Sequence, residues 1–358
     1  MQNKEIEVVF IQGRPFAHPT HANYAKSVNS DFSYIDIICP YYNDLKDSSI
    51  KRYFSWIMNA IFFKNRQKYH VFLSEEPYFY LGFMKFFGLI NDNQKLVSMF
   101  GTHTLYFLYT GKYSKVTSFL FKKLFNQYDL ILCEGKMQEE LLRIYIQNKK
   151  TKIIPIFNGN PSERYDKLYS KSPKLNSFNI LTIGSISNQD RIYYKGLDLM
   201  LEAFAIANEQ IPELTFTIIG TYDSVFIENL LSRIMGIRKE NITFAGYSND
   251  IEKYILTSDL YLHTARGEAW GISVTEALLG GLPAIVSEWT GSKEVVEKIS
   301  KDLIVSLDKE KIANKIVWYF NLSDKDKQSL SNFSKAISSE LTEQKANENF
   351  KKLFYNNI

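Results

Sequence analysis

The chain has 358 residues, of which 45% are hydrophobic and 23% are charged, and its formal net charge at pH 7 is +4. This length exceeds what one hydrophobic core usually accommodates, so we expect two domains. The composition is that of an ordinary globular protein, which excludes a disordered or fibrous chain, and we expect no nucleic-acid partner.

Three features bear on the compartment. The first ten residues, "MQNKEIEVVF", contain acidic residues where a signal peptide needs a basic start and then an apolar core. The most apolar window, 71–90, is interrupted by two glutamates and a lysine, so it does not read as a membrane span. Cys39 and Cys133 each end a strand-like run, and two buried thiols fit a reducing compartment better than a disulfide framework. We therefore expect a cytoplasmic protein.

Short β-rich runs alternate with helix-like stretches along the whole chain. In the first half we expect strands at 6–12, 33–39, 70–74, 95–100, 129–134 and 152–158. In the second half we expect strands at 178–184, 214–220, 241–246, 259–265 and 282–288, with a helix at 196–210 between the first two. Apolar runs this continuous suit parallel sheets that are covered on both faces. The sequence predicts an α/β fold with two doubly wound domains.

The polar, broken stretch 158–177 separates the two series and is typical of a linker. We place an N-terminal domain at 1–160, the linker at 161–177 and a C-terminal domain at 178–340. A last helix at 341–358 can pack back on the N-terminal domain.

Positive charge is concentrated in residues 51–152, which contain sixteen Lys or Arg and seven Asp or Glu, a balance of +9. This segment is also aromatic, notably over 51–70 and 112–127. Two interpretations stay open. Residues 51–127 could dock on an anionic membrane, at its inner face, or on an anionic acceptor. Alternatively, they form a solvated basic face over an aromatic core.

Several common cofactor motifs are absent. No G-x-G-x-x-G follows an expected strand, which argues against an NAD enzyme, and no G-x-x-x-x-G-K-[ST] exists, which excludes a P-loop. His18 and His21 form an H-x-x-H without further ligands, so we expect no metal there. Ligands of doubly wound sheets gather at the carboxyl ends of strands. The second series of strands places four glycines there, at Gly184, Gly220, Gly246 and Gly267.

The segment "RGEAWGISVTEALLGGLP" (266–283) carries two glutamates in such a position. Its glycines allow close approach of the backbone to a ligand, and a following helix N-terminus offers amides to an anion such as a diphosphate. Glu268 could then accept hydrogen bonds from sugar hydroxyls, and Glu276 from both hydroxyls of a ribose. The alternatives are a solvated loop acid for Glu268 and a capping box for "SVTE", in which Ser273 caps the helix and Glu276 returns to its amide. Considered without its setting, Glu276 is more typical of a capping box than of a ribose ligand.

The two glutamates, separated by seven residues and followed by "ALLGGLP", resemble the E-x7-E signature of the retaining nucleotide-sugar glycosyltransferases of family 4. The resemblance extends to "GSISNQDRIYYKGLDLMLEAF" (184–204), the phosphate loop and its helix, and to "TGSKEVV" (290–296). It also includes 241–265 and "IIPIFNGN" (153–160). It is strong over 178–300 and weak over 1–130.

The resemblance implies a GT-B fold, in which two Rossmann-like domains face each other across a cleft and the C-terminal one binds the donor. It implies catalysis without a metal or other cofactor, and retention of anomeric configuration by a same-face displacement. The leaving diphosphate then assists deprotonation of the acceptor. The expected partners are a nucleotide-sugar donor and a glycan or lipid-linked acceptor, as in cell-surface polysaccharide synthesis.

The resemblance also assigns roles to residues. Lys195 would neutralise the diphosphate, Glu268 would hold the donor sugar, and His103 would lie near the transferred sugar. The residues implied in nucleotide-sugar binding are Glu276, Arg191, Gly13, Gly184, Gly246, Gly271, Ile272 and Ser273. One departure from the family is Ser185, where an arginine is common, and Arg191 is the candidate replacement.

The residues also allow interpretations without these roles. Lys195 could be a surface charge and His103 a structural loop residue. Other functions on this fold are a sugar-nucleotide epimerase, a phosphorylase, which normally needs a longer chain, and a non-catalytic nucleotide-sugar binder.

Overall fold

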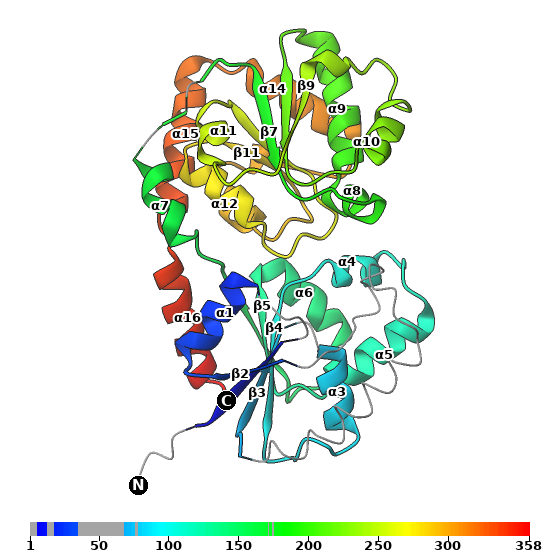
Figure 1. Cartoon of the computed structure of the whole chain (residues 1–358), viewed down its shortest axis with the longest axis vertical. Coiled ribbons are helices and arrows are strands. Elements are labelled where there is room, and N and C mark those ends of the chain that lie inside the picture. Colours follow the sequence, from blue (N-terminus) through cyan, green and yellow to red (C-terminus); the bar gives the residue numbers. More distant parts are fainter. Residues whose placement is uncertain (1–5, 13–17, 35–67, 76–77, 171, 174) are drawn as a thin grey trace. The chain divides into compact units, whose positions relative to one another are not determined.

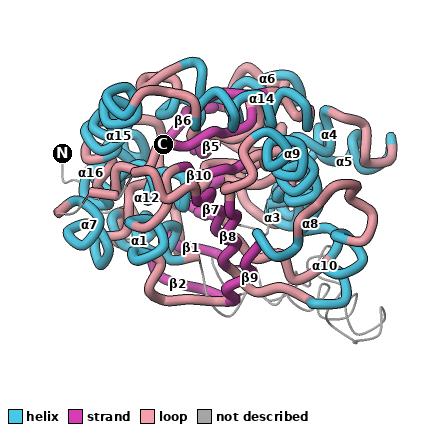
Figure 2. The backbone as a smooth tube through the Cα atoms, turned by 90° about the horizontal axis from the view of Figure 1, so that it is seen from above, coloured by secondary structure: helices cyan, strands magenta, loops and turns pink. Residues whose placement is uncertain are grey.

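The computed structural model describes residues 6–12, 18–34, 68–75, 78–170, 172–173 and 175–358. The chain divides into two compact units (Figure 1). Unit 1 contains residues 1–101, 107–157 and 346–358, and unit 2 contains residues 102–106 and 158–345. Each unit is built on one sheet of six parallel strands, with helices outside the strands (Figure 2).

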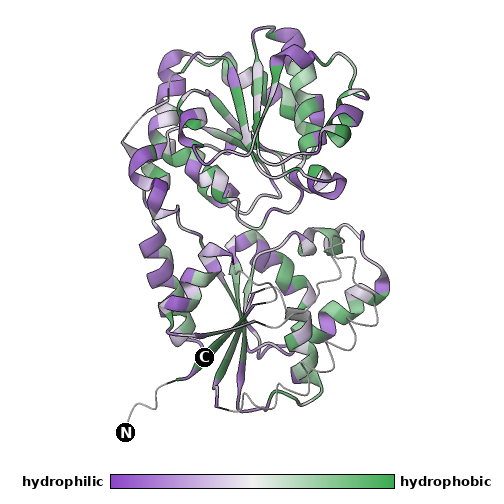
Figure 3. Cartoon of the chain, viewed as in Figure 1, coloured by the Kyte–Doolittle hydropathy of each residue, from purple (hydrophilic) through white to green (hydrophobic). Residues whose placement is uncertain are grey.

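The sheet of unit 1 has the strand order β2-β1-β3-β4-β5-β6. Its strands are β1 (Val8–Gln12), β2 (Asp31–Tyr34), β3 (Val71–Ser74), β4 (Lys95–Phe100), β5 (Leu130–Glu134) and β6 (Lys152–Ile156). The helices along this part of the chain are α1 (Pro19–Ser27), α3 (Tyr78–Phe86), α4 (Thr104–Tyr109), α5 (Lys115–Phe125) and α6 (Gly135–Tyr145). The continuous apolar runs become central strands because helices bury both of their faces, and these strands are coloured mainly as hydrophobic in Figure 3.

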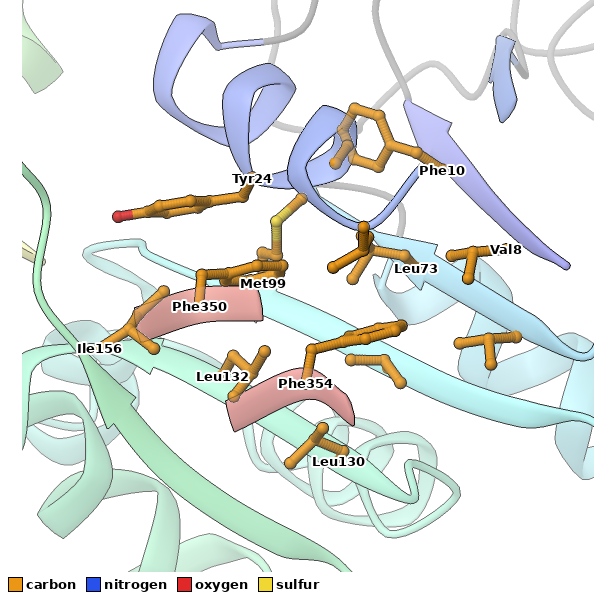
Figure 4. Close-up of a cluster of buried hydrophobic side chains, with 14 of the residues drawn as sticks. Val8, Phe10, Tyr24, Leu73, Met99, Leu130, Leu132, Ile156, Phe350 and Phe354 are labelled. Atoms are coloured by element: carbon orange, nitrogen blue, oxygen red, sulfur yellow. The ribbon is translucent and has the colours of Figure 1, made fainter. Parts of the chain in front are cut away.

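The core of unit 1 includes side chains from the C-terminal end of the chain. Helix α16 (Glu343–Tyr355) brings Ala346, Phe350 and Phe354, all buried, onto the sheet (Figure 4). The ring of Phe350 stacks on Tyr24 of α1 with 4.6 Å between centroids. Burying an aromatic side chain of this size stabilises by about 1.5–3 kcal/mol, so α16 is an integral part of unit 1.

The sheet of unit 2 has the strand order β12-β11-β10-β7-β8-β9. Its strands are β7 (Asn179–Ile183), β8 (Thr215–Ile219), β9 (Ile242–Gly246), β10 (Leu260–His263), β11 (Ala284–Ser287) and β12 (Ile304–Val305). Its helices are α7 (Ser162–Tyr169), α8 (Gln189–Lys195), α9 (Leu197–Gln210), α10 (Ser224–Leu231), α11 (Glu252–Leu256), α12 (Ile272–Leu279), α13 (Lys293–Val296), α14 (Lys309–Phe320) and α15 (Asp324–Ser338), with 3-10 turns η2 (Lys239–Asn241) and η3 (Lys301–Leu303).

The predicted α/β fold with two doubly wound parallel sheets is confirmed. Each of the eleven expected strands overlaps an observed one, although residues 35–39 lie outside the described part of the chain. Strand β12 was not expected, because its two residues are too short for a hydrophobic pattern. The apolar window 71–90 forms β3 and α3, and none of the described helices is long and apolar enough to cross a membrane. Cys133 is buried in β5, and Cys39 lies outside the described residues.

The segment expected to be a linker contains a helix. Helix α7 begins after Pro161 and carries an acidic residue, Glu163, in its first turn and a basic one, Lys167, in its last turn, an arrangement that suits the helix dipole. Leu168 of this helix is fully buried in unit 2. Part of the polar segment is therefore folded onto the unit that follows it.

Candidate functional site

The carboxyl ends of β7 and β8 are held together by two glycines. The amide of Gly184 donates to the carbonyl of Ile219 over 2.8 Å. Gly220 has φ of +143°, and a Cβ there would lie 2.0 Å from the carbonyl oxygen of Gly184. No side chain fits at position 220, so the two strand ends approach closely. A small pocket at this edge is lined by Gly184, Lys195 and His263, among others.

A third glycine places Lys195 at the same edge. Helix α8 ends at Lys195, and Gly196 follows in the left-handed conformation with φ of +73°. A Cβ on Gly196 would lie 2.0 Å from the carbonyl oxygen of Thr264, directly after β10. The side chain of Lys195 therefore lies next to Gly184, where a Cβ would be 3.7 Å from its methylene carbons.

Lys195 forms an ion pair with Glu268, from the loop that follows β10. The side chain of Glu268 is 14% exposed, and its Oε2 atom also lies 3.5 Å from Nε2 of His263, the last residue of β10. Burial alone would raise the pKa of Glu268, but Lys195 and His263 lower it well below its ordinary value. Burial lowers the pKa of His263, so its imidazole is neutral at pH 7. The solvated-loop interpretation of Glu268 is therefore wrong, because packing removes this side chain from water.

Other contacts fix the loop that carries Glu268. The guanidinium of Arg266 donates to both carboxylate oxygens of Asp198, each over 2.8 Å, and to the carbonyl of Tyr193 over 2.6 Å. The amide of Gly291 donates to the carbonyl of Glu268 over 2.9 Å. A Cβ on Gly291 would lie only 1.7 Å from the carbonyl oxygen of Ala269. These contacts fix the loop through the side chain of Arg266 and through the backbone of Glu268.

The second glutamate lies on α12 and is also buried. Its side chain is 4% exposed, and its Oε1 atom accepts a hydrogen bond of 2.9 Å from Nη1 of Arg164, on α7. Burial raises the pKa of Glu276, and Arg164 opposes that rise. The capping-box interpretation is wrong. Gly271, with φ of +88°, begins the helix without a side-chain cap, and the hydroxyl of Ser273 accepts from that of Tyr261 over 2.8 Å instead.

The first turn of α12 begins without a side-chain cap. The first amides of a helix have no partner within the helix, and no side chain caps those of Gly271, Ile272 or Ser273. Gly246, at the end of β9, has φ of +71°, and a Cβ there would meet no atom within 4 Å. On α8, the guanidinium of Arg191 has no ion-pair partner among the described residues. The binding roles of these residues stay predictions.

Three further positions from the sequence analysis are Gly13, His103 and His21 of the H-x-x-H. Gly13 is outside the described residues. His103 follows β4, in the short segment that groups with unit 2, and its ring centroid is 4.4 Å from that of Tyr194. His21 is buried in unit 1 between Glu75 and Glu134, at 3.1 and 3.0 Å, and these carboxylates outweigh burial and raise its pKa to about 10. The described residues contain no group of three or more His, Cys, Asp or Glu side chains suited to a metal ion.

Four contributors to the site were missed by the sequence analysis: His263, Arg266, Asp198 and Arg164. The first two stand in or next to the "RGEAWG" motif, at the end of a strand, and this position was a usable signal. Asp198 follows Lys195 by three residues. Arg164 had no signal, because it lies in a polar stretch 112 positions before its partner.

Comparison with known proteins shows which proteins this site resembles. Residues 179–338 match the model of the glycosyl transferases group 1 family. An uncharacterized 41.2 kDa protein from the cps region of Klebsiella pneumoniae is 27% identical over 241 residues, which cover 64% of this chain and 62% of that protein. The UDP-Gal:alpha-D-GlcNAc-diphosphoundecaprenol alpha-1,3-galactosyltransferase of Escherichia coli is 25% identical over 193 residues, which cover 50% of this chain and 47% of that enzyme. Each match spans less than two thirds of the relative.

Solved structures agree on the fold. Anabaena HepE in complex with UDP and glucose matches 98% of this chain and 100% of its own, with a TM-score of 0.68 and 15% identity. The predicted GT-B fold, with two Rossmann-like sheets, is confirmed by this match and by the two parallel sheets.

Proposed function

Since residues 179–338 match the model of the glycosyl transferases group 1 family, we propose that the protein transfers a sugar from a nucleoside-diphosphate sugar to a glycan or lipid-linked acceptor in the synthesis of a cell-surface polysaccharide. One observation carries this proposal. Lys195 and Glu268, 73 positions apart, meet beside Gly184 at the carboxyl edge of a doubly wound sheet. That edge is where such sheets bind their ligands.

The charges of the site suit a diphosphate donor. Lys195 and the uncapped first turn of α12 supply positive potential for the two phosphates. As the bond to the sugar breaks, negative charge builds on the leaving diphosphate, and an ammonium placed there stabilises it. Glu268, held ionised, accepts hydrogen bonds from the sugar hydroxyls. The buried Glu276 accepts hydrogen bonds from the ribose.

We propose that the reaction retains the anomeric configuration and needs no metal. The acceptor oxygen attacks the anomeric carbon from the face that the diphosphate leaves, and the acceptor proton passes to a diphosphate oxygen. The atoms balance without a further co-reactant. Lys195 performs the charge neutralisation that a divalent cation provides in other transferases.

The acceptor is proposed to be lipid-linked, because one relative acts on a diphosphoundecaprenol acceptor and because one face of α5 suits an anionic membrane. Val116, Phe119 and Leu120 are 69%, 57% and 47% exposed on this helix. Four exposed lysines surround them, Lys112, Lys115, Lys122 and Lys123. Exposed apolar side chains bordered by lysines are typical of interfacial helices. The protein then works at the inner face of the membrane. Residues 51–67 of the basic segment lie outside the described residues.

The direct test is a panel of UDP-, GDP-, ADP- and CMP-sugars, each measured by thermal shift and then by release of the nucleotide. A ligand at 100 times its dissociation constant stabilises the fold by about 2.7 kcal/mol. We expect one donor class to raise the melting temperature and to be turned over when acceptor is present. Binding without turnover on any acceptor would favour a non-catalytic binder, and epimerised donor would indicate an epimerase.

A further inference from the structure

Helix α7 supplies two cations to two buried carboxylates of unit 2. Arg164 donates to Glu276 of α12 over 2.9 Å, and Nζ of Lys167 lies 3.8 Å from Oε1 of Glu252 on α11. The two carboxylate side chains are 4% and 9% exposed. Leu168, fully buried, anchors the same helix, and a Cβ on Gly280 of the α12 end would lie 3.4 Å from it.

Only one oxygen of Glu276 is engaged. Oε1 accepts from Arg164, whereas Oε2 has no hydrogen-bond partner among the described residues. A carboxylate that is fixed through one oxygen presents the other in a defined direction. A buried ionised group without a fixed partner would be costly, so Arg164 also makes a charged Glu276 tolerable in this position.

The remaining groups around Glu276 do not replace Arg164. From α7 and α11, Glu163 and Glu252 are acidic and disfavour its charge. From β10, Tyr261 is a buried phenol whose pKa is raised by burial, so it is neutral. Strand β11 contributes "AIVS", without an ionisable side chain, and α15 places the Ser338 hydroxyl on the carbonyl of Thr275. Arg164 is the cation that faces this carboxylate among the described residues.

We propose that Arg164 is a positioning residue for donor binding, which holds Glu276 with its free oxygen available to the hydroxyls of a nucleoside diphosphate. This inference rests on the proposed function, in which Glu276 accepts hydrogen bonds from the ribose. It goes further because it makes donor affinity depend on α7, a helix that lies between β6 and β7 in the sequence, through the contact of Arg164 with Glu276.

The test measures the dissociation constant of UDP, or of GDP if the donor panel selects it, by calorimetry on the full chain between pH 7 and 9. We expect Arg164→Gln to weaken binding about tenfold at pH 7, within the range of one charged hydrogen bond. The loss should become smaller as the pH rises, because the pKa of Glu276 is raised further without its cation and a higher pH favours the ionised carboxylate. Arg164→Lys, which keeps the charge, should restore most of the affinity.

Lys167→Gln is the matched control, since it removes the other cation that α7 gives to a buried carboxylate. It should leave the dissociation constant and its pH profile unchanged. If Arg164→Gln binds like wild type, or if its effect persists undiminished in a Glu276→Gln background, the positioning role is refuted. If Glu276→Gln alone binds the nucleotide as wild type does, the assignment of Glu276 to the ribose is wrong, whatever the role of Arg164.

Discussion

The ammonium of Lys195 and the carboxylate of Glu268 form a mostly buried ion pair, with side chains 18% and 14% exposed. Both groups are charged before a donor binds, and each satisfies the other. A diphosphate that approaches Lys195 therefore meets a cation already fixed in place, with little reorganisation required during the reaction.

Loss of Lys195 should impair catalysis strongly. We expect Lys195→Ala to lower kcat about a hundredfold, because a charge-assisted contact that strengthens in the transition state is worth roughly 3 kcal/mol. Stability should also fall, since Glu268 is left buried with only His263 beside it. Lys253→Ala, which removes an exposed lysine of unit 2 outside the site, is the control. Equal losses of kcat for both variants would mean that Lys195 has no catalytic role beyond that of any positive charge of unit 2.

Glu268 and Glu276 should affect different steps. Glu268→Gln keeps the size of the side chain but removes its charge, so the sugar loses its strongest acceptor. We expect turnover to fall at least tenfold while the affinity for free nucleoside diphosphate is retained. Kinetics combined with calorimetry on UDP decides the matter, and a variant that loses nucleotide affinity instead would contradict the assignment to the sugar.

The decrease in stability at acidic pH should depend on Glu268. Its pKa in the folded chain is lowered, so its contribution is present above the ordinary carboxyl value, near 4.5, and is lost as the pH falls below it. Glu268→Gln should therefore flatten the decrease in melting temperature on acidification below about pH 5. An acid limb as steep as that of wild type would show that Glu268 does not contribute to it.

His21 should act at the opposite end of the pH scale. Glu75 and Glu134 raise its pKa from 6.5 to about 10, so its contribution is complete below pH 6.5 and is lost as the pH rises towards 10. We expect the melting temperature of wild type to decrease over this window and the decrease to be smaller in His21→Gln. His70→Gln changes an exposed histidine and should leave the profile as it is.

Gly196 should be irreplaceable for a steric reason. Alanine there would meet the carbonyl oxygen of Thr264 at 2.0 Å, in addition to the cost of φ at +73°. Gly111 has the same φ with nothing within 4 Å of a Cβ, so Gly111→Ala carries the conformational cost alone, about 1 kcal/mol. Urea unfolding should give a clearly larger loss for Gly196→Ala. Similar losses of unfolding free energy for both variants would mean that the backbone at Thr264 shifts to make room for the methyl group.

The α5 surface should bind acidic lipid. Charge reversal of Lys122 and Lys123 to Glu should reduce co-sedimentation with acidic liposomes and leave donor turnover on a water-soluble acceptor unchanged. Reversal of Lys149 and Lys150, exposed in the same unit, is the control and should have a small effect. Binding should weaken with salt, which screens exposed charges over about 8 Å at physiological ionic strength. Equal binding to neutral liposomes would contradict docking through charge.

Much of this architecture could be predicted from local patterns. Each expected strand was a continuous apolar run, and such a run has few ways to be buried other than in a parallel sheet covered on both faces. The glycines after four strands of the second series located one sheet edge. The resemblance of Glu268, Glu276 and Lys195-Gly196 to a family signature then placed the candidate site there.

Partners of the site residues could not be predicted in this way. "SVTE" has the letters of a capping box, but Gly271 adopts a left-handed conformation and begins the helix, so Ser273 bonds to Tyr261 instead. Glu276 is therefore free to pair with Arg164, which lies 112 positions away on a helix within a polar stretch. The sequence by itself determined the strands and their edge, because these follow from short-range periodicity, and it pointed to the candidate carboxylates through the resemblance of their spacing to a family motif. Only the tertiary structure decided which cation each carboxylate meets, because that depends on how distant helices pack.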